Sequence, residues 1–479
     1  MPVPAGWRLR PARGLRRARG GEVLLGGSPP RLLTLSSRGV GLVKAWLGGQ
    51  PVGEEVAERL LARRLLDAGL AHPDPPPGHS HGPARPQLAG EVTIIVPVHG
   101  RADRLERCLA ALSGGQPTIV VDDGSPDGAA IAAVAERFGA RYARHRENRG
   151  ASAARNTGVE LAETPLVAFL DSDCVPPPGF PEELLDHLAD PALGLVAPRI
   201  VSAGESAGRI AAYERHRSPL DMGPNPSLVR PFAWVWYVPS AAMVARREAL
   251  GRGFDEDLTL GEDVDLVWRL HDAGWQVRYD PRTRVAHRDR VEPWSWYRRR
   301  VAYNESVAPL LVRHPQRLPA LFVSPPAALG WGAFLAGAWP ALAMFAALRA
   351  ARLHRSVAGR LPGAAGWAIH ASVQATVQEG RDLGRALAGP WAPFAIAAAV
   401  GAGGRGRRGG GPARRIGALL AALVTADWLA DRPSLDPLSY GALRLADESA
   451  RGLGIWIACA RARDFRALLP RRPPPVSLR

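Results

Sequence analysis

Three short acidic clusters are the part of this sequence best suited to chemistry. They are Asp122-Asp123, Asp171-Ser172-Asp173 and Glu262-Asp263. Carboxylates one residue apart are hard oxygen donors, and they suit a Mg²⁺ or Mn²⁺ ion that carries the phosphates of a nucleotide. A carboxylate that faces a second substrate can instead remove a proton from a hydroxyl group. Taken alone, each cluster is also consistent with an acidic loop or with favourable charge at a helix N-terminus. The order of the clusters along the chain decides between these interpretations and a catalytic one.

An alternation of predicted strands and helices positions the first two clusters. Apolar strands are expected at 91–98, 118–125, 139–144 and 166–170, and helices at 104–112, 129–138 and 151–162. This alternation predicts an α/β fold with an open, mostly parallel sheet. Such sheets bind ligands at the carboxyl ends of their strands, where Asp122-Asp123 and Asp171-Asp173 fall. We therefore expect these two clusters to face one nucleotide.

Other polar groups fall between and after these clusters. The segment ENRGASAARNTGV (147–159) places Arg155 and Asn156 on a helix that follows a glycine turn, which favours support of the nucleotide. The third acidic cluster opens the predicted helix GEDVDLVWRLHDAGW (261–275). On an acceptor-facing helix, such a cluster could deprotonate a hydroxyl nucleophile.

The successive motifs VPVHGRADRLERCL, VVDDGS, NRGASAARN, FLDSD and GEDVDL resemble those of the family 2 glycosyltransferases, over about residues 91–305. No single motif is specific, but the ordered set is. The resemblance implies a GT-A fold, a UDP-sugar donor and aspartates at 122 and 123 that contact the uridine. By this interpretation the donor-binding residues are Pro97, Asp122, Asp123, Arg155, Asn156, Asp171 and Arg298.

The same resemblance implies a metal site and a catalytic base. Asp171 and Asp173 take the D-x-D role with Asp173 on the Mg²⁺ or Mn²⁺ ion, and His287 completes the metal site. A surface histidine after a strand is the alternative for His287. The pair Glu262-Asp263 supplies the base, most often the aspartate, for a single displacement with inversion that needs no covalent nucleophile.

Arg298 belongs to a basic and aromatic stretch, WSWYRRRVAYNES (294–306). The stretch stands where processive relatives carry a Q-x-x-R-W motif, but the glutamine and the final tryptophan are missing. We expect its arginines to bind the donor diphosphate or membrane phosphates, or to lie on a solvated basic helix. The role of this stretch stays open at the level of sequence.

The chain divides into four predicted regions. They are an N-terminal module at 1–74, a Pro/Gly/His linker at 75–90, the transferase domain at 91–316 and an apolar helical region at 317–479. The module combines two strands with a helix–turn–helix, which is a winged-helix pattern. The linker composition is typical of a domain boundary.

This order of regions is similar to that of the glycosyltransferases of the mycofactocin system, whose N-terminal module is of the PqqD-like peptide-recognition type. The resemblance implies UDP-glucose as the donor. It implies a peptide-derived redox cofactor as the acceptor, which receives β-linked glucose units. It also implies that a precursor peptide contacts the module by adding a strand to a sheet edge.

Charge and hydropathy suggest a membrane partner. The formal net charge is +16 and nearly all of it is arginine, which favours anionic lipids, nucleotides or phosphates. The apolar run Ala327–Leu348 is long enough to span a bilayer, and spanning, interfacial and soluble helices all remain open. The three cysteines have no disulfide spacing, so we expect a reducing compartment and the cytoplasmic face of the cell membrane.

Two other functions fit parts of the sequence. The apolar helices would also suit a membrane glycosyltransferase of cell-envelope polysaccharide or lipid-linked sugar synthesis. The winged helix could instead bind peptide or DNA without catalysis, and the arginine-rich N-terminus makes DNA worth considering. Glu54, Glu55 and Glu58 at the start of the second helix would repel phosphates, so we expect no nucleic-acid partner.

Overall fold

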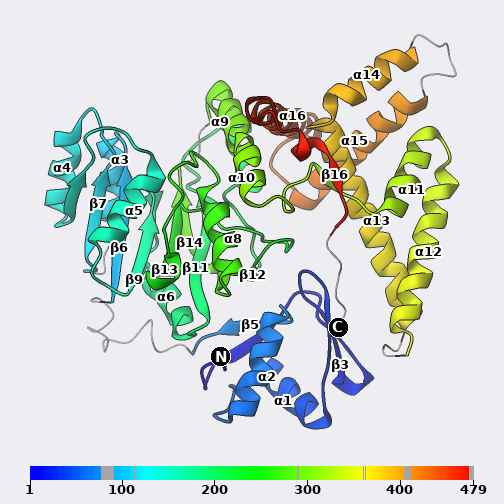
Figure 1. The fold of residues 1–479 in the computed structure, drawn as a ribbon, viewed down its shortest axis with the longest axis horizontal. Coiled ribbons are helices and arrows are strands. Elements are labelled where there is room, and N and C mark those ends of the chain that lie inside the picture. The colour runs from blue at the N-terminus through cyan, green and yellow to red at the C-terminus, as the bar shows by residue number, and fades with distance from the viewer. Residues whose placement is uncertain are drawn as a thin grey trace. The chain divides into compact units, whose positions relative to one another are not determined.

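The computed structural model describes residues 1–76, 91–112, 115–288, 291–359, 361, 363–403 and 411–473. These residues form two compact units, coloured along the chain in Figure 1. The first unit takes the described residues within 1–205 and 217–289, and the second takes those within 206–216 and 290–475. The predicted linker at 75–90 lies almost wholly outside the described residues. The units therefore divide the chain differently from the predicted boundary at 316, because 206–216 and the first helices after 290 group with the C-terminal helices.

The N-terminal module contains the two strands and two helices that its sequence predicts, together with three short strands that it does not. Its elements are β1 (Arg8–Pro11), β2 (Arg16–Ala18), β3 (Val23–Gly26), β4 (Arg31–Thr34), α1 (Ser37–Leu47), α2 (Val56–Asp67) and β5 (Ala71–Asp74). β2, β3 and β4 form an antiparallel sheet in that order, and β1 pairs with β5. The side chain of Ser36 caps α1 by accepting a hydrogen bond from Gly39 N at 3.3 Å. Trp7, Trp46 and Leu66 lie in the core that holds these elements together.

A nine-stranded sheet, flanked by helices, forms the rest of the first unit. Its strands are β6 (Val92–Val98), β7 (Thr118–Asp122), β8 (Arg141–Arg144), β9 (Leu166–Leu170), β10 (Cys174–Val175), β11 (Leu193–Ser202), β12 (Ser227–Val229), β13 (Ala242–Arg246) and β14 (Gln276–His287). The order is β10-β14-β11-β13-β9-β6-β7-β8, with β12 also paired to β14. β9, β6, β7 and β8 are parallel to one another, as are β11 and β14, whereas β13 is antiparallel to both of its neighbours. The predicted α/β fold with a mostly parallel sheet is confirmed.

Helices flank this sheet and connect its strands (Figure 1). They are α3 (Ala102–Ala110), α4 (Gly128–Arg137), α5 (Ala151–Leu161), α6 (Glu182–Leu185) and α8 (Glu262–Asp272). Every residue of β6 is buried, Thr93 included, as its largely apolar sequence predicts. Asp122 ends β7 and Asp171 follows β9 directly, so both acidic clusters stand at the carboxyl ends of the two parallel strands that flank β6, as expected.

The second unit is mainly helical. Its helices are α7 (Arg209–Arg217), α9 (Pro293–Glu305), α10 (Val307–Arg313), α11 (Pro325–Ala336), α12 (Trp339–Val357), α13 (Ala364–Ala388), α14 (Ala392–Gly403), α15 (Gly411–Asp431) and α16 (Pro437–Ala462). Tyr213 on α7 packs edge-on against Trp296 at 6.1 Å between ring centroids and lies 5.6 Å from the ring of Tyr440. This aromatic cluster explains why α7 groups with the C-terminal helices.

Of the alternatives that the sequence left open for Ala327–Leu348, a single membrane-spanning helix is not the one that the structure shows. The run is broken between α11 and α12, where Gly337 adopts a φ of 108° and Pro340 enters the first turn of the next helix. In the part of the chain that the structure describes, no helix combines the length and the hydropathy needed to cross a bilayer.

Candidate active site

Arg155 joins two of the acidic clusters that the sequence singles out. It lies on α5, which begins after Gly150, and its side chain is almost wholly buried. Its Nη2 donates to Asp171 Oδ1 at 2.6 Å and its Nη1 donates to Glu262 Oε1 at 3.2 Å. The guanidinium also lies over the ring of Phe254, 5.3 Å from its centroid. The D-x-D loop after β9 and the N-terminus of α8 therefore meet at one arginine.

The two aspartates of the D-x-D motif have different surroundings. Burial raises the pKa of Asp171, and the neighbouring charge of Asp173 adds to this, while Arg155 lowers it. Asp173 instead lies beside two other groups, with Arg104 Nη1 at 3.4 Å from its Oδ2 and His287 Nε2 at 3.5 Å from its Oδ1. Asp171 is thus held by the arginine, and Asp173 is left to face the histidine.

His287 reaches this position because β14 pairs with β10. The pairing sets His287 opposite Cys174, the residue after Asp173. Among the described residues, no three of His, Cys, Asp or Glu stand together as a metal-holding group. Asp171, Asp173 and His287 therefore do not form such a group, and the Asp171 carboxylate accepts from Arg155 instead, so the role of the three as metal ligands stays a prediction.

Asp173 and His287 nonetheless fit a divalent cation as a pair. They offer a carboxylate oxygen and an imidazole nitrogen, both of which bind such ions. Mg²⁺ is often held by only one or two protein carboxylates, with substrate phosphates and water completing its coordination. The donor set is therefore consistent with an ion that arrives with a nucleotide diphosphate.

The third acidic cluster is held by a residue that the sequence did not reveal. Ser240 Oγ donates to Glu262 Oε1 at 3.0 Å, and Ser240 N donates to Asp263 Oδ2 at 3.4 Å. Asp263 Oδ1 also accepts from Val264 N at 2.8 Å. Burial raises the pKa of Asp263 to about 7, and the adjacent charge of Glu262 adds to the effect. A carboxylate with such a pKa suits general-base catalysis near neutral pH.

Asp122 and Asp123 both bond within the protein. Asp122 Oδ1 accepts from Ser125 N at 2.8 Å and its Oδ2 accepts from Tyr142 Oη at 2.7 Å. Burial opposes ionisation of Asp122, but these hydrogen bonds outweigh it and lower the pKa. Asp123 accepts from Gly150 N at 2.7 Å and also contacts His145 Nδ1 at 2.8 Å. Both aspartates fasten the loop after β7, and their contact with a uridine stays a prediction.

The remaining predicted residues are spread over three places. Pro97 is buried in β6, opposite Val121 of β7. Asn156 donates to Phe254 O at 2.9 Å and accepts from Phe254 N at 2.8 Å, so it holds the chain after β13 rather than pointing a free amide at the site. Arg298 lies on α9 in the second unit, and its role at the donor stays a prediction.

Arg104 and Ser240 are the site residues that sequence reasoning missed. Arg104 stands in one of the quoted motifs, but an arginine on a helix has no feature that marks it as a partner of Asp173. Ser240 precedes β13, whose antiparallel insertion between β9 and β11 brings it to α8. That long-range pairing leaves no local signal in the sequence.

Known proteins resemble this chain at two levels. The model of the family "Glycosyl transferase family 2" matches residues 93–254. The pre-mycofactocin glycosyltransferase of Mycobacterium tuberculosis (strain ATCC 25618 / H37Rv) is 38% identical over 490 residues, which cover 98% of each chain. The glycosyltransferase AglE of Haloferax volcanii is 27% identical over 201 residues, or 39% of this chain and 64% of its own.

The solved structures include a similar one, a mannosyltransferase from Pyrobaculum calidifontis in complex with GDP-Man and Mn²⁺. It is 19% identical with a TM-score of 0.36, and the match covers 60% of this chain and 86% of the mannosyltransferase chain. The relative from Mycobacterium tuberculosis matches essentially from end to end, so it includes the N-terminal module and the C-terminal helices. The chain therefore belongs to the family of the pre-mycofactocin glycosyltransferases, with a catalytic domain of the glycosyl transferase family 2 type.

Proposed function

We propose that this glycosyltransferase transfers glucose from UDP-glucose to the peptide-derived redox cofactor (pre)mycofactocin, giving β-linked glucose units. The observation that carries the catalytic part is the contact of Arg155 with both Asp171 and Glu262, which places the donor-side loop next to the proposed base. The end-to-end similarity to a pre-mycofactocin glycosyltransferase supports the acceptor.

In the proposed reaction, Asp263 removes the proton from an acceptor hydroxyl as the hydroxyl oxygen attacks the anomeric carbon. The bond from that carbon to the diphosphate breaks on the opposite face, so the configuration inverts and UDP leaves. Glu262 is a positioning residue, since it accepts from Ser240 and Arg155 and its charge adds to the burial that raises the pKa of Asp263. A carboxylate that is half protonated near neutral pH can both take up the proton and release it after each turnover.

The donor side rests on the residues around Asp173. A divalent ion held by Asp173 and His287 would supply positive charge beside the leaving diphosphate. Arg104 adds a cation at 3.4 Å from Asp173. Arg155 keeps Asp171 and Glu262 in fixed positions, so the carboxylates do not have to reorganise during the reaction.

The N-terminal module is proposed to contact a precursor peptide, as PqqD-like modules do. Its three-stranded sheet has β2 and β4 as outer strands, and an extended peptide could pair with such an edge.

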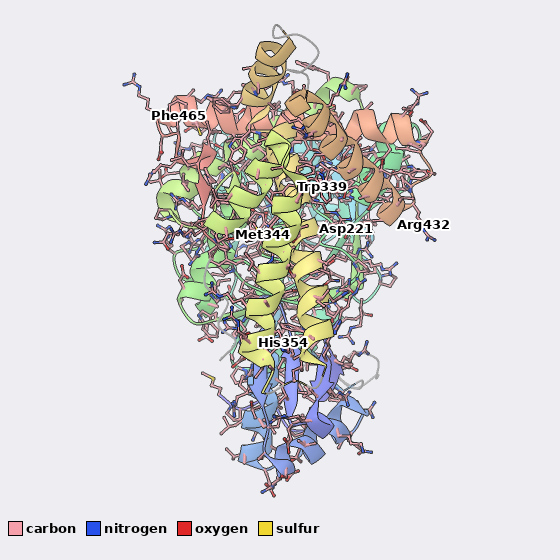
Figure 2. All side chains as sticks on the ribbon, turned by 90° about the vertical axis from the view of Figure 1, so that its right-hand side faces the viewer. Asp221, Trp339, Met344, His354, Arg432 and Phe465 are labelled. Carbon is pink, nitrogen blue, oxygen red and sulfur yellow. The ribbon has the colours of Figure 1, made fainter. Side chains whose placement is uncertain are left out.

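The second unit is proposed to rest on the anionic cytoplasmic face of the membrane. Large apolar side chains are exposed on α12, among them Trp339 and Met344, which Figure 2 shows on the side facing the viewer. Arg352 and Arg355, exposed further along the same helix, suit anionic lipid.

The test is product analysis by mass spectrometry with the full chain, UDP-glucose and either premycofactocin or a polyprenyl phosphate. We expect hexose on the cofactor with the native protein, none with Asp263→Asn, and normal transfer with Asp272→Asn, an exposed aspartate on the same helix. Transfer only to the lipid would refute the proposed acceptor and favour envelope or lipid-linked sugar synthesis.

A further inference from the structure

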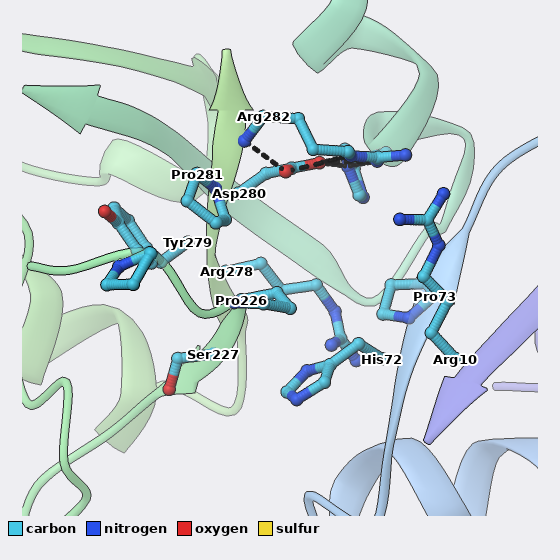
Figure 3. A pocket seen from close by; sticks show the side chains of 12 residues that line it. Arg10, His72, Pro73, Pro226, Ser227, Arg278, Tyr279, Asp280, Pro281 and Arg282 are labelled. Atoms are coloured by element: carbon cyan, nitrogen blue, oxygen red, sulfur yellow. Dashed lines mark hydrogen bonds and ion pairs between the residues drawn. The ribbon is translucent and has the colours of Figure 1, made fainter. Parts of the chain in front are cut away.

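A cavity of about 150 Å³ lies inside the first unit, away from the residues of the candidate active site. It opens between the N-terminal module and the outer part of the sheet, and its walls come from β1, β5, β12 and β14 (Figure 3). Four prolines line it, namely Pro73, Pro224, Pro226 and Pro281. Proline rings are rigid and apolar, so these walls form a preshaped space that would fit a body about the size of one aromatic ring.

The distinctive group of this cavity is the buried guanidinium of Arg278. Its side chain is 3% exposed, and its Nη2 donates to the neutral amide oxygen of Gln276 at 3.1 Å. Its Nε has no hydrogen-bond partner among the described residues. A buried N–H group that is left unpaired is costly, and more so when it is charged, so such a group points to a missing acceptor.

The other arginines of the cavity already have carboxylate partners. Arg10 Nε lies 2.9 Å from Asp74 Oδ2, and Arg282 Nη1 lies 2.7 Å from Asp74 Oδ1. Arg282 also pairs with Asp280, as the dashed lines in Figure 3 show. Arg278 has no such ion pair within the described part of the chain. The charges of Asp190 and Asp67 act on it from outside the cavity lining, so among the three lining arginines its guanidinium is the one without a carboxylate in contact.

Two histidines complete the polar lining. Figure 3 shows the guanidinium of Arg278 beside the ring of His72. Burial lowers the pKa of His72 to about 4, and the charge of Arg278 adds to this effect. The ring is therefore neutral near pH 7 and does not compete with Arg278 for an anion. His187 bonds through Nε2 to Asp280 at 2.7 Å, and its buried Nδ1 has no partner among the residues described.

The backbone around the cavity is also irregular. The register between β11 and β14 jumps from Pro198 opposite Asp280 to Arg199 opposite Arg284. Residues 281–283 therefore have no partner in β11 at this point. Bulges of this kind re-aim side chains next to functional sites, and this one carries Pro281 and Arg282 to the cavity wall.

We propose that this cavity binds a small organic carboxylate whose body is about the size of one aromatic ring, with the carboxylate paired to Arg278. Carboxylate geometry matches the planar fork of a guanidinium, and the proline walls match an apolar body better than a bare phosphate. The carboxylate could belong to a free acid or to the end of a peptide chain. The site is separate from donor binding, because none of its lining residues belongs to the candidate active site.

The test is isothermal titration calorimetry on the full chain, with benzoate as the free acid and N-acetylalanine as the mimic of a peptide end. Benzamide serves as the neutral counterpart of benzoate, and inorganic phosphate serves as the alternative anion. We expect saturable binding of at least one carboxylate, without competition from UDP-glucose. If benzoate binds, benzamide should bind at least tenfold more weakly than benzoate. The stronger of the two acids identifies the source of the carboxylate.

Variants separate the cavity from general charge effects. Arg278→Gln should lower carboxylate affinity at least tenfold, whereas Arg284→Gln, an exposed arginine on the same strand, should not. Ser227→Leu keeps Arg278 and fills the cavity, so it should abolish binding even if the Arg278 variant does not fold. Absence of binding by both acids, stronger binding of phosphate, or unchanged affinity in Ser227→Leu would overturn the proposal.

Discussion

At the scale of single residues, Arg155 is the group on which the candidate active site depends. It is a buried cation that contacts Asp171 in the loop after β9 and Glu262 on α8, the helix that carries the proposed base. Its planar fork can reach both oxygens at once, which a lysine ammonium cannot do with the same geometry. The positions of Asp171 and Glu262 are therefore coupled through one side chain.

Arg155→Lys should lower kcat/KM about a hundredfold, because misplacing catalytic groups by about an ångström has effects of that size. Steady-state kinetics with UDP-glucose and the acceptor would measure this. Arg149→Lys is the matched control, since Arg149 lies just before the same helix and pairs at the surface with Glu256. Equal loss in both variants would show that the effect is not specific to the bridge.

The expected pH dependence of the reaction follows from Asp263 as the proposed base. The base acts only when ionised, and its pKa is raised to about 7, so kcat/KM should fall as the pH drops below about 7 and level off above it. Glu262→Gln removes a negative charge that raises this pKa, so the acidic limb should move to lower pH. An acidic limb that lies at the same pH in Glu262→Gln as in the native protein would contradict this coupling.

At the scale of elements, the sequence identifies the strands whose apolar runs are unbroken. β6, β7 and β9 read as buried parallel strands and occur where expected, as do the helices between them. β14 reads QVRYDPRTRVAH, in which four charged residues interrupt the apolar pattern of a strand, and β13 gives no sign that it runs antiparallel. The acidic residues could therefore be predicted, whereas the contacts from Ser240 and Arg104 depend on pairing that only the fold provides.

The packing of α5 against the sheet predicts a specific intolerance. A Cβ at Gly158 would lie 2.3 Å from Ile95 Cγ2, so Gly158→Ala should destabilise the fold by about 1–3 kcal/mol through overpacking. Gly41→Ala is the control. Apart from the nearby backbone of helix α1 and the chain neighbours of Gly41, no described atom lies within 4 Å of the added methyl group, so this variant should gain up to about 1 kcal/mol. The midpoint of urea unfolding distinguishes the two, and equal shifts would contradict the packing of α5 on β6.

At the scale of the whole molecule, the proposed catalytic residues and the proposed membrane surface belong to different units. The first unit holds the acidic clusters, and the second exposes apolar side chains on its helices. Trp339 is 68% exposed and Met344 is 62% exposed, although both are large and apolar. Such side chains gathered on one helix with arginines are typical of an interfacial surface.

Vesicle cosedimentation tests this surface. The full chain should bind vesicles that contain phosphatidylglycerol. The double variant Trp339→Glu with Met344→Glu should bind about tenfold more weakly, because two negative charges replace apolar side chains that would contact the lipid. The matched control is Val56→Glu with Leu60→Glu, two exposed apolar residues of the N-terminal module. Equal loss of binding in both double variants would place the contact elsewhere.

The most direct test of the proposed reaction is the anomeric configuration of its product, read from the proton NMR spectrum of the glucosylated cofactor made from UDP-α-glucose. Single displacement with Asp263 as the base predicts a β-linkage, together with loss of product in Asp263→Asn. An α-linked product would contradict the mechanism, since retention requires a different arrangement of catalytic groups.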